Sequence, residues 1–157
     1  MRQTFDRRSV LGLAVGGAAG AVLVSSAQPS QAAGTTYKAA LDGASEVPPA
    51  TTTGKGSATV TYDAATKTVT WEGNFSGLSG PATAAHIHGP AEAGKNAGVI
   101  VPLSQQGTPF TSPFKGSATL ADDKAAALAA ALSSGQAYVN VHTDANKGGE
   151  IRGQLKS

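Results

Sequence analysis

The stretch GKGSATVTYDAATKTVTWEGNF, residues 54–75, contains two runs of alternating residues separated by a short turn. Residues 54–62 and 67–75 are rich in threonine, valine and aromatic residues, which favour strands. The Asp63-Ala64-Ala65-Thr66 segment between them predicts the turn of a β-hairpin. In the second run, Val69 alternates with threonines and leads to Trp71, the only tryptophan, which we therefore expect on the inward face.

Other short segments of strand character lie on both sides of this hairpin, separated by glycine, proline, asparagine and serine. We expect these further strands at residues 35–41, 84–88, 98–103, 114–120, 137–143 and 150–155. Residues 43–54 contain two adjacent prolines and predict a loop. Eight short strands predict a mainly β fold, namely an antiparallel Greek-key or immunoglobulin-like β-sandwich or barrel.

One segment differs from the rest because its apolar residues recur at helical spacing. Within residues 122–134 these are Ala125, Leu128, Ala129 and Leu132. Asp122 is a candidate cap, and Gly135 provides a stop signal. We expect one short helix here, packed over the sheets.

The N-terminus has the order of an export signal. Arg7-Arg8 precedes an apolar stretch at residues 10–24, and a polar region with small residues follows. The adjacent arginines favour a twin-arginine signal peptide over residues 1–32, with one β domain over residues 33–157. Cleavage is expected after Ala32, with a site after Ala27 as the alternative. The apolar run is short for a bilayer span, so we expect no permanent membrane span in the mature protein. The expected location is the periplasm, the cell envelope or the outside of the cell.

Charge and cysteine content exclude several classes of function. The chain has 12 basic and 10 acidic residues, but three of its arginines lie in the predicted signal, so the remaining body is close to neutral. We therefore expect no nucleic-acid partner. The chain has no cysteine, which excludes disulfides, thiolate nucleophiles, iron–sulfur clusters and blue-copper centres. It also has no Gly-x-Ser-x-Gly elbow and no phosphate-binding glycine loop, so hydrolase and nucleotide-binding functions lack support.

The three histidines lie in two predicted strands. His86 and His88 are two residues apart, so their side chains leave an extended chain on the same face. His142 shares a face with Tyr138 and Asn140 in the later strand. If the two strands lie beside or opposite each other, three imidazoles converge on one ion. Imidazole suits copper and zinc, so we predict a copper site at His86, His88 and His142, with zinc as the alternative.

Simpler interpretations apply to the same residues. A His-x-His pair at a strand end can bond only to backbone carbonyls or solvent. Three ligands leave an open position for water, a small oxidant, a partner's side chain or a carboxylate such as Asp144 or Glu150. Glu46 is interpreted as a solvated loop acid, and Arg152 as a structural residue that pairs with an acid. Residues 144–149 are interpreted as a hairpin turn.

Four ordered motifs resemble the CHRD domain, the module first described in chordin. They are Ala85-His86-Ile87-His88-Gly89-Pro90-Ala91, Ala137-Tyr138-Val139-Asn140-Val141-His142-Thr143, Gly149-Glu150-Ile151-Arg152-Gly153-Gln154-Leu155, and Leu41-Asp42-Gly43 with Glu46-Val47-Pro48-Pro49. The resemblance implies an extracytoplasmic β-sandwich-like domain of a kind found in bacterial exported proteins. The His-Ile-His-Gly string is also similar to the strand histidines of copper–zinc superoxide dismutases. Those enzymes need further histidines and a disulfide, so we do not expect a dismutase.

The leading functional hypothesis is an exported metal-binding protein, most simply for copper, that serves in storage, delivery or a small redox role. We expect no catalytic residue. One alternative is a cofactor-free module that binds another envelope or extracellular protein, by analogy with chordin. Another is a copper or zinc enzyme that uses the open coordination position. Short edge strands also allow a homodimer through edge pairing.

Overall fold

The predicted hairpin is present as β2 (Lys55–Asp63) and β3 (Thr68–Ser76), paired antiparallel from Lys55 opposite Ser76 to Asp63 opposite Thr68. The computed structural model describes residues 34–157, and the signal predicted for residues 1–32 lies outside them. Within the described residues, no helix is both long and apolar enough to cross a membrane.

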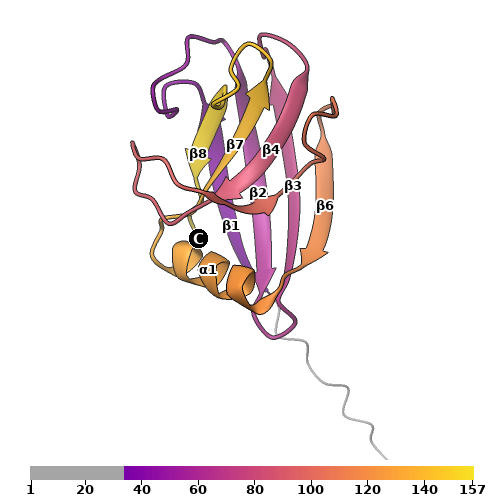
Figure 1. The fold of residues 1–157 in the computed structure, drawn as a ribbon, viewed down its shortest axis with the longest axis vertical. Helices are drawn as coiled ribbons and strands as arrows, with labels where there is room; N and C mark the ends of the chain where they lie inside the picture. The colour runs from indigo at the N-terminus through magenta and orange to yellow at the C-terminus, as the bar shows by residue number, and fades with distance from the viewer. Residues whose placement is uncertain (1–33) are drawn as a thin grey trace, which may run out of the picture. The chain divides into compact units, whose positions relative to one another are not determined.

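The eight strands of residues 34–157 belong to one antiparallel sheet (Figure 1). Its order is β5-β4-β7-β8-β1-β2-β3-β6. The remaining strands are β1 (Thr35–Asp42), β4 (Ala82–His88), β5 (Val99–Pro102), β6 (Phe114–Thr119), β7 (Tyr138–Thr143) and β8 (Ile151–Gln154). The expected mainly β, antiparallel fold is therefore confirmed, as is the loop between β1 and β2. Its finer Greek-key or immunoglobulin-like topology stays a prediction.

The sheet curls until elements near its two ends meet. Trp71 on β3 donates its indole N–H to the carbonyl of Leu103, just beyond β5, at 3.1 Å. Because β5 and β3 lie far apart in the strand order, this bond forms only if the sheet bends back on itself. Phe110, in the loop after β5, packs edge-to-face on Phe75 of β3 with ring centroids 5.6 Å apart. The inward position predicted for Trp71 is confirmed, since the ring packs against the core.

The alternate residues on the inner face of this curled sheet form the core. They include Val60, Val69, Ile87, Val139, Val141 and Ile151, all fully buried. The opposite face of each strand is left for polar side chains, because successive residues point to opposite faces.

The predicted helix is α1 (Asp122–Ser133), which covers one end of the curled sheet (Figure 1). Leu128 and Leu132 are buried, and the hydroxyl of Tyr62 donates to the carbonyl of Ala125 at 3.2 Å. The expectation that Asp122 caps the helix is wrong, because the N-cap is Ala121. Asp122 lies in the first turn instead, where its carboxylate forms an ion pair with Lys67 at 2.6 Å.

Candidate metal centre

The strands that carry the three histidines are neighbours in the sheet. β4 pairs antiparallel with β7, with His86 opposite Asn140, His88 opposite Tyr138 and Ala84 opposite His142. Val139 and Val141 point into the core, so the alternate residues of β7 face outward together with His86 and His88. The prediction that the two strands place all three imidazoles on one face is thus confirmed.

The three rings gather within the span of one ion. Their ligand atoms all lie within 4.8 Å of one another. The closest pair is Nδ1 of His86 and Nε2 of His142, at 3.0 Å. Since Zn–N and comparable bonds measure about 2.0–2.1 Å, a small contraction of this group would bring the three nitrogens to bonding distance of one cation.

Backbone carbonyls orient two of the rings. Nδ1 of His88 lies 3.0 Å from the carbonyl oxygen of Ala97, and Nδ1 of His142 lies 3.0 Å from that of Lys147. A carbonyl only accepts, so in each neutral imidazole the proton is on Nδ1 and the lone pair is on Nε2. Such hydrogen bonds select the tautomer and the ring orientation that a metal needs.

The surroundings keep the imidazoles in the form that binds metal. Burial, with the neighbouring His142 and His88, lowers the pKa of His86 to about 4. Burial also lowers the pKa of His88 and that of His142. All three rings are therefore neutral at pH 7. Since Nδ1 of His142 donates to Lys147, its Nε2 accepts the proton of His86 Nδ1, and a bound cation would take the place of that proton.

Two of the rings can be reached from solvent. His86 and His142 line a cavity of about 390 Å³, whose other lining residues include Thr83, Asp144 and Lys147. His88 does not line it. A ligand from outside would therefore approach from the side of His86 and His142.

A loop at residues 89–98 covers the rest of the polar face. Its Ala97 N–H donates to the hydroxyl of Tyr138 at 3.1 Å, and Asn96 Oδ1 accepts from Arg152 at 3.0 Å. The ring of Tyr138 is stacked on His88, with centroids 4.9 Å apart, and the guanidinium of Arg152 lies 3.4 Å from the centre of the same ring. Because β7 lies between β4 and β8, these contacts form one continuous stack from Arg152 to His88.

Glu46 occupies an unexpected place beside this stack. The interpretation as a solvated acid is wrong, because the side chain is only 4% exposed. Burial raises the pKa of its carboxyl to about 7, although Arg152 and Asn140 act in the opposite direction. Oε1 of Glu46 is buried and has no hydrogen-bond partner among residues 34–157.

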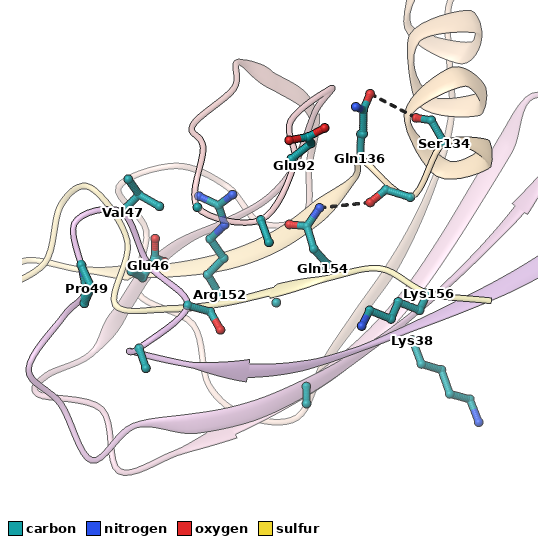
Figure 2. Close-up of a pocket in the computed structure, with 17 residues that line it drawn as sticks. Lys38, Glu46, Val47, Pro49, Glu92, Ser134, Gln136, Arg152, Gln154 and Lys156 are labelled. Carbon is teal, nitrogen blue, oxygen red and sulfur yellow. Dashed lines mark hydrogen bonds between the residues drawn. The ribbon is translucent and has the colours of Figure 1, made fainter.

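Figure 2 shows Glu46 and Arg152 together at the wall of a second cavity, of about 1050 Å³. The guanidinium of Arg152 is held by the loop at residues 89–98 and by Tyr138, which agrees with a structural role. The expected ion pair with an acid is not found among residues 34–157. The cavity lies on the far side of Arg152 from the histidines, because β8 follows β7 in the sheet.

Asp144 and Glu150 were the two carboxylates expected as possible further ligands, and both oxygens of Glu150 are already engaged in hydrogen bonds. Glu150 is fully buried and accepts hydrogen bonds from Thr52, Ser79, Thr143 and Asn146. Burial alone would raise its pKa, but these donors lower the pKa to about 2. Asp144 is exposed and lines the smaller cavity beside His86 and His142.

The chain was compared with curated proteins, solved structures and models of protein families. Neither curated proteins nor solved structures match the chain. The family model of the CHRD domain matches residues 37–155, which include every strand that carries the histidine group. That match covers well over half of the chain, so this protein belongs to the CHRD domain family.

Proposed function

We propose that this protein is an exported metal-binding protein whose centre, formed by His86, His88 and His142, holds one copper ion for storage, delivery or a small redox role. The observation that carries the proposal is the convergence of three neutral imidazoles, two of them oriented by backbone carbonyls.

The donor set supports copper over other ions. Imidazole nitrogens suit copper and zinc, and copper(II) binds such sites more tightly than the other divalent first-row metals. Zinc is the second choice. Accessibility of His86 and His142 from the smaller cavity supports exchange of the ion with a partner or a small ligand.

An extracytoplasmic location agrees with two features of the chain. The Arg7-Arg8 segment with its apolar stretch is typical of a twin-arginine signal. CHRD domains are typically extracellular. The periplasm, the envelope and the medium all agree with this proposal.

Metal content tests it directly. Protein exported by its own signal is analysed for metals, and metal-free protein is titrated with copper and with zinc. The parent should take up close to one copper per chain, and the triple variant His86→Ala, His88→Ala, His142→Ala should take up none while keeping its fold. Lys147→Ala is the matched control, because its side chain lines the same cavity but carries no metal ligand at neutral pH.

Metal binding should also weaken with acid. Because protons compete for the same lone pairs, copper affinity should fall as the pH decreases toward the lowered pKa values of the three histidines. Affinity that does not change with pH would contradict imidazole ligation.

Family membership supports a second function, that of an extracellular interaction module. In that case the folded parent binds neither copper nor zinc tightly, and the triple histidine variant retains partner binding. Substitutions in the exposed loops should then abolish that binding.

A further inference from the structure

Asn140 lies on the polar face between Tyr138 and His142 and is only 3% exposed. Its Oδ1 atom lies 3.0 Å from Nε2 of His88. An amide so close to a candidate ligand atom either competes with the metal or helps to bind it.

Hydrogen-bond accounting distinguishes these roles. Both ring nitrogens of His88 lie 3.0 Å from an oxygen that only accepts: Nδ1 from the carbonyl of Ala97 and Nε2 from Oδ1 of Asn140. An imidazole with one N–H can donate to only one of these oxygens. When it donates to Ala97, the lone pair of Nε2 faces Oδ1 of Asn140, and a cation beside both atoms would relieve their repulsion.

The other end of the amide explains why Oδ1 points to the histidines. Nδ2 of Asn140 lies on the side of the carboxyl of Glu46, since both border the same space beside Gly149, and a carboxyl favours an amide whose N–H groups are turned toward it. A Cβ atom on Gly149 would lie 2.8 Å from Nδ2 of Asn140 and still closer to Oε1 of Glu46. Both side chains therefore occupy the space that Gly149, at φ +131°, leaves open.

The charged groups around Glu46 agree with this role. Arg152, which Figure 2 shows beside Glu46, is the cation that acts on the carboxyl. The guanidinium is engaged by the loop at residues 89–98, and Oε1 of Glu46 has no donor within residues 34–157. The amide of Asn140 is then the group through which Glu46 acts on the site.

We propose that Oδ1 of Asn140 is the fourth donor of the metal centre, beside Nδ1 of His86, Nε2 of His88 and Nε2 of His142, and that Glu46 is the positioning residue that orients this amide. The inference rests on the proposed function and extends it to the coordination sphere. Two ligands at 2.0–2.1 Å from one ion and at right angles are about 3 Å apart. The pair of His88 and Asn140 and the pair of His86 and His142 both show that spacing, at 3.0 Å. Three nitrogens and one oxygen suit the tetragonal geometry of copper(II).

Copper(II) titration followed by electron paramagnetic resonance tests the assignment. The parent is compared with Asn140→Ala, Asn140→Asp and the control Asn74→Ala, which removes an exposed amide on β3 that contacts Ser57 and no histidine. Asn140→Ala should weaken copper binding about 10-fold or more and change the copper hyperfine pattern. Asn140→Asp, which restores an oxygen donor, should recover both, and Asn74→Ala should resemble the parent.

Glu46 gives an independent readout. Glu46→Ala should reproduce part of the loss seen in Asn140→Ala, because the amide loses its anchor. Glu46→Gln keeps the size of the side chain and one carbonyl oxygen, and should restore the parental spectrum. Equal spectra in Glu46→Ala and the parent would overturn the positioning role.

A measurement on the unmodified protein covers the case in which the Asn140 variants do not fold. Zinc, which is diamagnetic, is added to metal-free parent, and the side-chain carbonyl carbons are followed by nuclear magnetic resonance. The carbon of Asn140 should shift well beyond that of Asn96. If the carbons of Asn140 and Asn96 shift equally while copper and zinc still bind through the histidines, Asn140 is not the fourth donor and the proposed function stands. A parent that binds neither ion overturns the proposed function as well.

Discussion

Two buried glutamates beside the turn between β7 and β8 have pKa values shifted in opposite directions. Glu150 and Glu46 are 0% and 4% exposed, yet the pKa of the first is lowered to about 2 and that of the second is raised to about 7. Glu150 has donors from three loops and from the end of β7, whereas Glu46 has one oxygen with no partner in residues 34–157. Burial depth therefore does not decide the charge of a carboxyl; the number of donors aimed at it does.

The comparison gives opposite dependences of stability on pH. The lowered pKa of Glu150 contributes stability that is complete above its unfolded pKa near 4.5 and is lost as the pH falls toward 2. The raised pKa of Glu46 acts in the other direction, because the unfolded chain releases its proton first. Stability from that site falls as the pH rises from about 4.5 to about 7.

The largest effect is expected from Glu150→Gln. The change keeps the shape but removes the charge and places an N–H₂ group among donors, so it should lower the free energy of unfolding at pH 7 by about 3 kcal/mol or more. Urea denaturation followed by circular dichroism measures it. A loss below about 1 kcal/mol would show that the donors around Glu150 do not stabilise its charge.

Glu46→Gln should have the opposite sign. At pH 8 the variant avoids burying a charge and should be more stable than the parent by up to about 3 kcal/mol, with the difference disappearing toward pH 4.5. Denaturation at both pH values checks this. Destabilisation at pH 8 would mean that the ionised carboxyl is satisfied after all, and the contrast with Glu150 would fail.

Gly149→Ala sharpens the contrast by testing the space around Glu46. The new Cβ meets Glu46 and Asn140 at a φ of +131°, so a loss of about 2 kcal/mol is expected. In the Glu46→Ala background the clash with Glu46 should disappear, leaving the contact with Asn140 and the cost of the backbone. A double-mutant cycle with a coupling energy of about 1 kcal/mol supports this packing, and strict additivity contradicts it.

The smallest change is Thr52→Val, which removes one of the donors to Glu150 at similar volume. A loss of about 1 kcal/mol is expected, since the other donors remain. Repeating the denaturation at pH 3 checks whether the remaining donors keep Glu150 ionised. Because the pKa of Glu150 is about 2, the same loss should be found there.

Local alternation explains why much of the site could be predicted from sequence. His86 with His88, and Asn140 with His142, are two residues apart, and that spacing determines the face of a strand without any knowledge of its neighbours. The pairing of β4 with β7 does not follow from the sequence, because it joins segments on either side of β5, β6 and α1.

Burial of loop residues could not be predicted in the same way. Glu46 lies in a loop without periodicity, and other loops, together with Arg152 and Asn140, enclose it. The donors to Glu150 likewise come from residues 52, 79, 143 and 146, which only the complete fold brings together. The signal for Glu46 in the sequence is its place in the Glu46-Val47-Pro48-Pro49 motif, which resembles the start of the CHRD domain.

Trp71, bonded to Leu103, and Tyr138, stacked on His88, are two aromatic residues whose optical signals report on different parts of the molecule. Trp71 is the only tryptophan, and its indole lies where the curled sheet meets itself, so its emission should report opening of the sheet. Tyr138 is stacked on His88, and its near-ultraviolet signal should instead respond to a change at the histidines. Unfolding and metal loading can therefore be followed in one cuvette, without a label, as changes at two different chromophores.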